Sequence, residues 1–572
     1  MFKLPKLLSF LLLLTVVACG GNKSDLILDP PQTQESPGPE SPEPPNTPVE
    51  EEPVVSNVSS KIAFVLEQDD GTFDLYAVDL QDPTSLTLVA EDIYVLSAEY
   101  YAYFWNPNQE KIAYSADRDG DGYAEIYLSD LEGSTTKLSP EVTGSHSLIF
   151  SWSPDGSKLV YLYQADPIVE SNYDLYVSSL EGEIFPLSEG AFYEPDLRSP
   201  RWISNEQLII MAKKDGKRQL YLHSLSEAPI RINQDLAAGR KVYYYKLSPD
   251  NSKIAYIADV EVYDKDELYW VDLSNTPLSA PVKVNTAFPD AYSILGYMLW
   301  SPDSSYLLYT QVDLVLPLEG GPLTPVRRLY SYETETGSRD IISSDFQTLD
   351  GTLRGVNSSA WSPDGSKIAY TADQDVEGFT ELYVVDWPAG SIHKANAPTS
   401  CGAGIREFSW SPDSRYLAYD CLGVLNINLE YLHVYDTVNL QSQILSENYL
   451  GDLGVKREID QFIWSPSSNH LVYQSNQAAS DFNEVFLISP TGSPIQANPD
   501  LLASEDAKLE LYFDPWSPDG RVFVYKYGGS DKVTAVYWME SGENLVLNSL
   551  FDDFGPIPVP GLSFFAPDWV LE

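Results

Sequence analysis

The chain has 572 residues, of which 43% are hydrophobic and 12% aromatic, so it can bury one large core or two medium ones. Its formal net charge is −49. A surface of this sign excludes nucleic acid and bare anionic membrane as favoured partners. The same acidity also serves solubility or a saline habitat, in which case it points to no partner.

The first 18 residues have the pattern of an export signal. Two lysines precede an apolar run from Leu7 to Val17, which is too short to span a membrane. The run leads into Val-Ala-Cys19-Gly-Gly, which resembles the lipobox of bacterial lipoproteins. That resemblance implies cleavage before Cys19 and acylation of its thiol and new amine. We therefore expect an exported protein held to the membrane through lipid alone, on the periplasmic face of an outer membrane or the outer face of the cell membrane. An ordinary signal with a chance cysteine is the alternative.

A spacer follows in residues 19–54. The stretch Pro30–Pro53 contains nine prolines and six glutamates and has almost nothing to bury, so we expect an extended, solvated linker. At about 3.1 Å per residue it reaches up to roughly 70 Å from the lipid.

One phrase, written WSPDGSKIAY at Trp361, recurs across residues 55–572. Ten units are spaced 45 to 61 residues apart, and nine of the 12 tryptophans take the same position in them. A period in this range is typical of a repeat architecture. The positions are Trp105, Trp152, Trp202, Leu247 in place of tryptophan, Trp300, Trp361, Trp410, Trp464, Trp516 and Trp569.

Each unit predicts the same succession of short strands. Ser-Pro-Asp-Gly favours a tight turn between a first and a second strand, because proline presets φ, aspartate caps the backbone and glycine accepts positive φ. Strands such as KIAYTA (367–372) are apolar on both faces, which is typical of sheets covered on both sides. The tryptophan is expected to fill the gap between neighbouring sheets. The sequence therefore predicts an all-β fold, a β-propeller of about ten four-stranded units.

The motif resembles the WD-like repeat of the TolB family, whose members carry tandem WSPDGxxIAF…DIYVxDL units, and the resemblance spans roughly residues 55–572. It implies a propeller that binds ligands in its channel and on its faces. Ten units exceed the six blades of that family, so either one wide ring or two rings form, with a candidate ring boundary near 300–360. Residues 61–79 lack a first strand and the C-terminal APDWVLE lacks the strands after it. The two ends are expected to share one blade, which leaves no open edge.

Cys401 and Cys421 are the cysteines that remain after the signal. Disulfides persist in exported proteins, so the pair forms either a disulfide or two free thiols. The repeat places them about four residues out of register on a hairpin, which works against the geometry of a disulfide.

Two acidic hairpins have the spacing of calcium ligands, because alternate oxygens around a glycine suit a hard cation. The first, DRDGDGYAE, is similar to the nine-residue calcium hairpins of integrin-type propellers. The candidate ligands are Asp117, Asp119, Asp121, the carbonyl of Tyr123 and Glu125 in the first hairpin, and Asp373, Asp375, Glu377 and Glu381 in a weaker second copy. The alternative is that Asp-Gly pairs favour hairpin turns without any metal, and no cofactor is then required.

Aromatic clusters precede two of the first strands. They consist of Tyr100, Tyr101 and Tyr103, and of Tyr243, Tyr244 and Tyr245. First strands line the channel of a propeller, and the loops before them lie on one face. Tyrosine suits contact with protein or glycan, so these clusters indicate a binding patch. Packing between blades is the alternative.

No residue pattern demands catalysis. The sequence lacks the G-x-S-x-G elbow of the hydrolase domain that accompanies propellers of the prolyl-oligopeptidase type. Propeller lyases acting on oligogalacturonate share this repeat type and hold a metal with histidines, but here the histidines lie in different units without metal-site spacing. They are His146, His223, His393, His433 and His470. We therefore expect a binding or scaffold protein for an envelope protein, peptide or glycan. A glycan-active lyase or hydrolase is the alternative.

Overall fold

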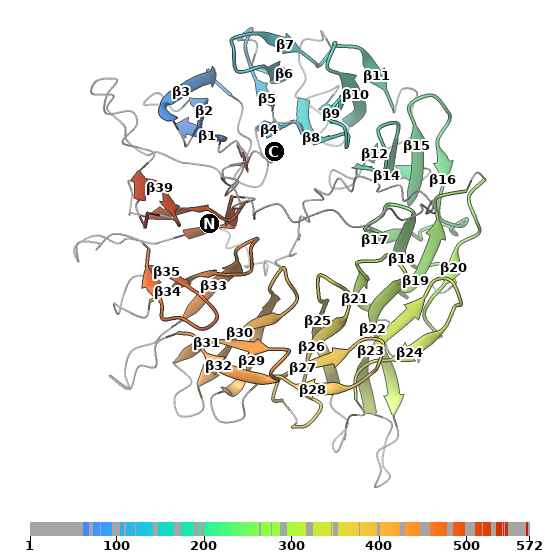
Figure 1. Cartoon of the computed structure of the whole chain (residues 1–572). Helices are drawn as coiled ribbons and strands as arrows, with labels where there is room; N and C mark the ends of the chain where they lie inside the picture. The colour runs from blue at the N-terminus through green and yellow to red at the C-terminus, as the bar shows by residue number, and fades with distance from the viewer. Residues whose placement is uncertain are drawn as a thin grey trace, which may run out of the picture. The chain divides into compact units, whose positions relative to one another are not determined.

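Every regular element in the described part of the chain is a β-strand, and the strands form antiparallel sheets of about four (Figure 1). The computed structural model describes residues 61–67, 72–79, 82–93, 103–107, 110–120, 122–140, 147–164, 173–187, 194–195, 200–214, 216–261, 263, 265–275, 277–286, 295–315, 324–344, 346, 353–376, 378–396, 401–423, 429–446, 458–476, 484–497, 510–517, 519–527, 533–539, 541–542, 544–546 and 568–569. These residues belong to the second of two units, 1–56 and 57–572. Among them, no helix has the length and apolar character needed to cross a membrane.

The sheets follow one another in chain order and are numbered here as blades one to ten. Blade one contains β41 (Asp568–Trp569), β1 (Lys61–Glu67), β2 (Phe73–Asp79) and β3 (Asp82–Ala90). Blade two contains β4 (Tyr103–Trp105), β5 (Ile112–Ala116), β6 (Glu125–Ser129) and β7 (Thr135–Lys137). Blade three contains β8 (Ser147–Trp152), β9 (Lys158–Gln164), β10 (Tyr173–Ser179) and β11 (Ile184–Pro186). Blade four contains β12 (Glu194–Pro195), β13 (Arg201–Trp202), β14 (Gln207–Lys214), β15 (Lys217–Ser224) and β16 (Ile230–Arg231). Blade five contains β17 (Val242–Leu247), β18 (Lys253–Ala258), β19 (Glu267–Asp272) and β20 (Val282–Lys283).

The second half repeats this order. Blade six contains β21 (Leu295–Trp300), β22 (Tyr306–Val315), β23 (Thr324–Glu333) and β24 (Arg339–Ile341). Blade seven contains β25 (Arg354–Trp361), β26 (Lys367–Ala372), β27 (Glu381–Asp386) and β28 (Ile392–Lys394). Blade eight contains β29 (Cys401–Trp410), β30 (Tyr416–Gly423), β31 (Glu430–Asp436) and β32 (Gln441–Ile444). Blade nine contains β33 (Ile459–Trp464), β34 (Leu471–Ser475), β35 (Glu484–Ile488) and β36 (Ile495–Gln496). Blade ten contains β37 (Glu510–Trp516), β38 (Val522–Tyr527), β39 (Val533–Trp538) and β40 (Asn544–Val546).

The two ends of the repeat region share blade one. β41 pairs with β1 through Ile62↔Trp569 and Ala63↔Asp568, so the last strand of the chain supplies the first strand of this sheet. The hydroxyl of Tyr103 in blade two donates to the carbonyl of Ala63 at 2.9 Å. The predicted all-β propeller of about ten units with a shared terminal blade is thereby confirmed.

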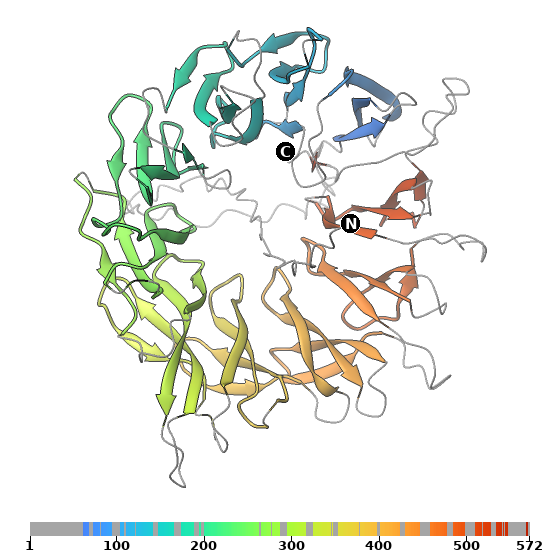
Figure 2. The ribbon, with the colours of Figure 1, turned by 180° about the vertical axis from the view of Figure 1, so that it is seen from behind.

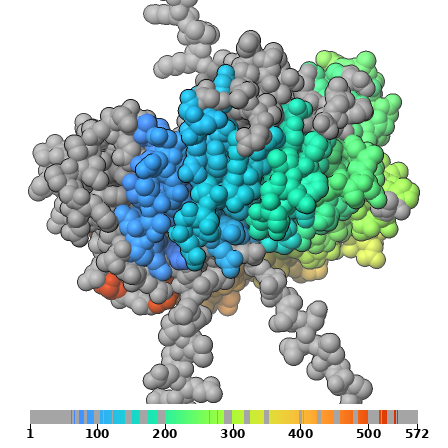
Figure 3. Space-filling view, turned by 90° about the horizontal axis from the view of Figure 1, so that it is seen from above, coloured from blue at the N-terminus to red at the C-terminus, as the bar shows by residue number. Residues whose placement is uncertain are grey.

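Successive blades lie side by side in the order of the chain, as the colours of Figures 1 and 2 show, and the space-filling view shows the first four blades in this order (Figure 3). In the region 300–360 two blades join into one sheet, because β23 pairs in parallel with β25. Gly355 makes this approach possible, since a Cβ there would lie 2.3 Å from the carbonyl oxygen of Arg327. The ring boundary expected in this region stays a prediction.

In the eight first strands whose terminal tryptophan side chain the structure describes, that tryptophan packs between two blades. In five blades its Nε1 donates to the carbonyl of the residue just before the equivalent position of the preceding blade. The pairs are Trp152 with Phe104 at 3.4 Å, Trp202 with Ser151 at 3.3 Å, Trp300 with Lys246 at 3.0 Å, Trp464 with Ser409 at 3.1 Å and Trp516 with Ile463 at 3.2 Å. The indole therefore fills the gap between blades, as expected, and also hydrogen-bonds across it.

A buried tyrosine on the second strand forms the centre of most blades. It stacks on an aromatic ring of the third strand, with centroids 4.9 to 6.0 Å apart. The pairs are Tyr114 with Tyr127, Tyr161 with Tyr176, Tyr256 with Tyr269, Tyr309 with Tyr330, Tyr370 with Tyr383, Tyr419 with His433 and Tyr473 with Phe486. Burying this aromatic surface between covered sheets adds to the hydrophobic stabilisation of these seven blades.

The turn after the tryptophan is held by its serine and aspartate. In blade seven the Ser362 hydroxyl donates to Asp364 at 2.6 Å and accepts from the backbone N–H of Lys367 at 2.9 Å. In this turn of blade seven, the residue with positive φ is Gly365. In the equivalent turn of blade eight, it is Ser414. The Ser414 hydroxyl then accepts from the backbone N–H of Asp364 in the preceding blade at 2.9 Å. A serine at the glycine position thus adds a link between blades, which the sequence pattern alone did not indicate.

Replacing Trp464 by phenylalanine should lower the free energy of unfolding by about 1 kcal/mol more than the same change at Trp410. Both indoles are buried, so both variants lose similar apolar area. Trp464 also loses its hydrogen bond to Ser409, whereas the Nε1 of Trp410 has no hydrogen-bond partner among the residues that the structure describes. Urea unfolding of the two single variants measures the difference, and equal losses would contradict a contribution from the indole N–H.

Candidate functional site

The first acidic hairpin is closed by its own aspartate. Asp117 follows β5, and its carboxylate accepts from the backbone N–H groups of Gly120 at 2.9 Å and Gly122 at 2.8 Å. Asp119 is exposed and Tyr123 is half-buried, while Asp121 lies outside the described residues. The Asp117 carboxylate therefore does the turn-capping that the metal-free alternative requires.

Glu125 begins β6 and is buried. Its carboxylate accepts from Lys137 Nζ on β7 and from the hydroxyl of Tyr127, each at 3.2 Å. This predicted ligand is thus paired with an ammonium on the neighbouring strand.

The second hairpin contains a protein cation. Lys394 Nζ on β28 lies 3.2 Å from Asp375 and also forms an ion pair with the buried Glu381. Burial acts to lower the pKa of Lys394, but its hydrogen bonds to Glu381 and Asp375 outweigh burial and raise that pKa. An ammonium group therefore occupies the position between two of the predicted ligands. Glu377 lies outside the described residues.

Asp373, the first residue of the second hairpin, is bound by groups of the protein. It accepts from the backbone N–H of Gly355 at 2.8 Å and lies 3.5 Å from the Nε of Arg354. Asp373 thus ties the hairpin to β25 in the same blade.

A lysine on the fourth strand paired with a glutamate at the start of the third strand is a repeated feature. It occurs in blade five as well, where Lys283 Nζ lies 2.6 Å from Glu267 and 2.7 Å from Glu261. The sequence contained the signal, a lysine before an apolar residue and Ser or Asn in TTKLS, PVKVN and IHKAN. Sequence reasoning assigned Glu125 and Glu381 to calcium and missed their lysine partners, because the lysines come from another strand.

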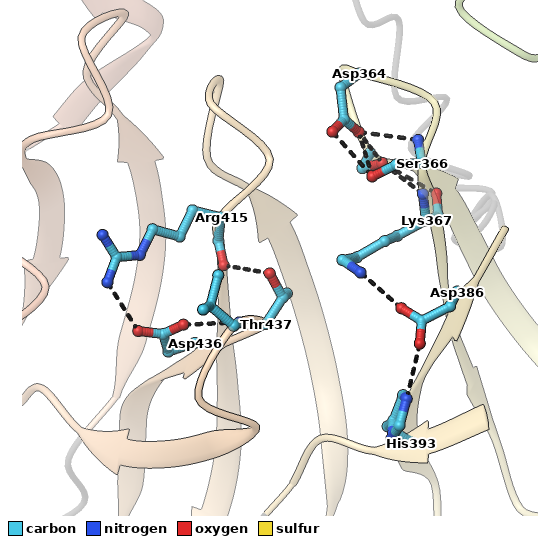
Figure 4. Close-up of polar contacts among 10 residues, drawn as sticks. Asp364, Ser366, Lys367, Asp386, His393, Arg415, Asp436 and Thr437 are labelled. Atoms are coloured by element: carbon cyan, nitrogen blue, oxygen red, sulfur yellow. Dashed lines mark hydrogen bonds and ion pairs between the residues drawn. The ribbon is translucent and has the colours of Figure 1, made fainter. Parts of the chain in front are cut away.

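Blade seven and blade eight carry ion pairs on their turns (Figure 4). Asp386 lies between Lys367 Nζ at 2.6 Å and His393 Nε2 at 2.9 Å. The Lys367 hydrogen bond is the main cause that lowers the pKa of Asp386. Arg415 pairs with Asp436 at 3.2 Å in the next blade. Each ion pair joins strands of a single blade and so stabilises that blade.

The other described histidines are not gathered into a metal site. Burial lowers the pKa of His223 and of His433 to about 4, and it also lowers that of His470. His146 lies outside the described residues. In the part of the chain that the structure describes, one group of three metal-ligand atoms lies within 4.8 Å, from Cys401, Cys421 and His433.

Those two cysteines form a disulfide, with Cα atoms 5.4 Å apart. The expected mismatch of register is absorbed by irregular pairing in β29, where register shifts lie between Cys401 and Ile405 and between Ile405 and Phe408. As a result Cys401 pairs with Gly423, two residues from Cys421. Bulges of this kind insert residues into one strand, which a symmetric hairpin count does not include.

Asp420 is a buried carboxyl beside this disulfide. It accepts from the backbone N–H of Glu407 at 2.7 Å, and the Nε of Arg406 lies 3.9 Å away. Arg406 forms its closer ion pair with Glu430. Burial raises the pKa of Asp420 to about 7, against the opposing effects of the Glu407 N–H and the Arg406 charge. No sequence signal separated Asp420 from the other 83 acidic residues.

The predicted tyrosine patch divides into packed and exposed members. Tyr103 is buried and bonded to blade one, so the packing alternative holds there, and Tyr100 and Tyr101 lie outside the described residues. In blade five, Tyr243 packs against the blade-six side and Tyr245 against the blade-four side. Tyr244 is the exposed member, with 44% of its surface accessible.

No protein-family model and no curated protein matches the chain. Among solved structures, a eukaryotic initiation factor aligns at 13% identity over 76% of this chain and 95% of its own length, with a TM-score of 0.45. Dipeptidyl peptidase 4 of Porphyromonas gingivalis aligns at 12% identity over 81% of this chain and 61% of its own, with a TM-score of 0.42. A putative TolB from Agrobacterium tumefaciens aligns at 17% identity over 46% of this chain and 83% of its own, with a TM-score of 0.25. Function therefore has to be argued from the residues of this chain.

Calcium at the Asp117 hairpin stays a prediction, and a melting comparison tests it. A bound ion stabilises the folded state by mass action, so the full-length protein should melt higher in calcium than in EGTA. Asp117→Asn should remove the difference. Asp375→Asn, in the hairpin where Lys394 is the cation, should leave it unchanged. Equal melting midpoints of the parent protein in calcium and in EGTA would contradict calcium binding at this hairpin.

Asp420→Asn should flatten the pH dependence of stability between about pH 4 and pH 7. The folded carboxyl has its pKa raised from 3.8 to about 7, so in this window the folded chain keeps a proton that the unfolded chain releases. Stability of the parent protein therefore falls as the pH rises. Asparagine keeps an acceptor for the Glu407 N–H but has no proton to release. Urea unfolding across this range should show the variant gaining on the parent toward pH 7, and a constant difference would refute the assignment.

Proposed function

We propose that this chain is a lipid-anchored β-propeller of the cell envelope that works by binding a partner. The observation that carries the proposal is the exposed ring of Tyr244 on β17, a first strand, between neighbours that are packed. First strands of propellers line the channel where ligands dock. A tyrosine with 44% exposure there provides an apolar ring and a polar tip for a ligand.

Four aspartates with lowered pKa values are explained by the fold. The carboxylates of Asp155, Asp250, Asp303 and Asp364 have lowered pKa values, because hydrogen bonds from the serines of their own turns outweigh burial. Such groups serve the fold, since they cap the same turn in blades three, five, six and seven.

The anchor is proposed on sequence grounds. Cys19 follows the apolar run of the export signal, and the acidic proline-rich spacer separates it from blade one. Acylation of Cys19 would hold the propeller at the membrane surface through lipid. The partner would then be an envelope protein, a peptide or a glycan.

A glycan-active lyase or hydrolase is the second candidate, and Asp420 is the observation in its favour. A carboxyl with a pKa of about 7 is the kind of group that acts as a general acid. However, Asp420 is only 2% exposed, so a substrate has no direct access to it in this conformation. Turnover of a polysaccharide that is lost in Asp420→Asn would favour this candidate.

A photo-crosslinking amino acid at position 244 should capture a defined partner in intact cells of the native host. The same crosslinker at Val438, which is 72% exposed on a turn of blade eight, is the matched control and should not capture it. A Cys19→Ala chain should leave the membrane fraction and lose the adduct if partner and anchor belong together. An identical pattern of adducts from positions 244 and 438, or none from 244, would contradict the proposed binding strand.

A further inference from the structure

Blade eight brings a histidine against the disulfide. Cys421 on β30 pairs with Tyr431 on β31, and Tyr419 pairs with His433, so Cys421 and His433 are diagonal neighbours on one face of the sheet. Diagonal residues of an antiparallel pair are close enough for their side chains to meet. The Sγ of Cys421 lies 3.7 Å from the Nδ1 of His433. Strand register thus places a sulfur atom beside an imidazole nitrogen.

The two cysteines and the histidine form a compact, buried group. The sulfur atoms of Cys401 and Cys421 and a ring nitrogen of His433 all lie within 4.8 Å of one another. No other set of three potential metal ligands lies this close among the described residues. Cys401 is 5% exposed, and Cys421 and His433 are 0% exposed. Three donor atoms therefore face one another in a place that excludes bulk water.

The repeat does not require these residues. In the other six stacked pairs, the position of His433 is taken by tyrosine or phenylalanine, namely Tyr127, Tyr176, Tyr269, Tyr330, Tyr383 and Phe486. Two residues after the stacked tyrosine, where blade eight has Cys421, blades two, five and seven have alanine. Both departures occur in one blade and lie side by side. The packing rule of the blades does not account for them.

The separation of the sulfur and the nitrogen suits a shared metal ion. Tetrahedral zinc lies about 2.3 Å from sulfur and about 2.0 to 2.1 Å from nitrogen, which holds those two atoms about 3.6 Å apart. Cys421 and His433 have a separation of 3.7 Å. Two zinc-bound sulfurs lie about 3.8 Å apart. Rotation of one cysteine about its Cα–Cβ bond provides that separation once the disulfide is reduced.

The charge and softness of the donors also select zinc. Thiolate and imidazole are ligands of zinc, whereas calcium and magnesium take oxygen ligands. Two thiolates, a neutral imidazole and Zn²⁺ sum to zero charge, which a buried site tolerates. The imidazole of His433 is already held in place, because it stacks on Tyr419 at 4.9 Å and contacts the edge of Tyr431 at 6.4 Å.

We propose that the reduced form of blade eight binds one zinc ion through the sulfur atoms of Cys401 and Cys421 and the Nδ1 of His433. The disulfide is the oxidised, metal-free form of the same site. In that form Nδ1 lies 3.2 Å from the carbonyl of Tyr431, and zinc takes the place of this contact. The inference goes beyond the proposed partner binding and does not depend on Tyr244.

The two forms interconvert by thiol–disulfide exchange and metal binding. A dithiol reductant gives two electrons and two protons to the disulfide and becomes a disulfide itself, which leaves Cys401 and Cys421 as thiols. Each thiol then loses its proton to solvent as it binds Zn²⁺. In the reverse direction, a disulfide oxidant takes two electrons from the thiolates and two protons from solvent. The bond between the cysteines forms again and zinc leaves.

A cobalt titration of the reduced mature chain tests the site. A Cys19→Ser background leaves Cys401 and Cys421 as the only thiols. The chain is reduced with dithiothreitol, which is then removed without air. Co²⁺ should form a one-to-one complex with a sulfur-to-cobalt charge-transfer band, which the many carboxylates of this chain cannot give. Zn²⁺ should abolish the band by displacing cobalt, because zinc suits tetrahedral sulfur and nitrogen donors. The oxidised chain should give no band.

His433→Phe isolates the nitrogen ligand. In blade nine, Phe486 takes this position and stacks on Tyr473 at 5.3 Å, so the variant keeps the stacked pair and loses the donor. Removing a group that only orients a ligand costs about 10- to 100-fold in metal affinity, so removing a ligand should weaken cobalt binding about tenfold or more. The matched control is His223→Phe, the same change at a buried histidine of blade four, which should alter affinity by less than about twofold. Unchanged melting midpoints of the oxidised variants show that they remain folded.

Three results would overturn the assignment. The first is a reduced parent chain without the charge-transfer band. The second is a His433→Phe chain that binds cobalt with the affinity of the parent. The third is a band of equal strength in the oxidised chain, because that form has no thiolate. None of these outcomes bears on the crosslink from position 244, so the zinc site and the binding function are tested separately.

Discussion

The contact of one indole across the gap between two sheets is the constraint on which the rest of this structure depends. The side chain fills space that two twisted sheets leave at their inner strands, and in five blades its N–H also donates to a carbonyl of the blade before it. Because the side chain recurs at a fixed repeat position, it helps each of these blades to position its neighbour. The long succession of blades is thus built from a nearest-neighbour rule, as in other repeat proteins.

The acidity of the chain is partly structural. Aspartates cap the turns after the tryptophans, and glutamates at the start of third strands pair with lysines of the fourth strands, as Glu381 does with Lys394. These carboxylates are needed by the blades whether or not a ligand binds. Their number alone says nothing about metal binding or catalysis, and the informative residues are those that break the repeat.

Blade five breaks the repeat most clearly. Leucine replaces the interblade tryptophan there, a tyrosine is exposed beside it, and a cation stands at a position that is uncharged in most other blades. Blade eight breaks it differently, with a disulfide and a carboxyl whose burial raises its pKa to about 7. Departures from a structural rule cost stability and are expected at functional sites. Blades five and eight are therefore the places where a function is to be sought.

The sequence by itself determined the fold class, the ten units, the closure of blade one by both ends and the place of the tryptophans, because these follow from local patterns of turns and apolar residues. Only the tertiary structure decided which predicted site residues meet. Lys394 reaches Asp375 and Glu381, and Cys401 meets Cys421, through strand register and bulges that no local pattern encodes. Tyr103 and Tyr244 look alike in the sequence, yet one is buried and the other exposed, since exposure depends on which neighbouring blade covers each side chain.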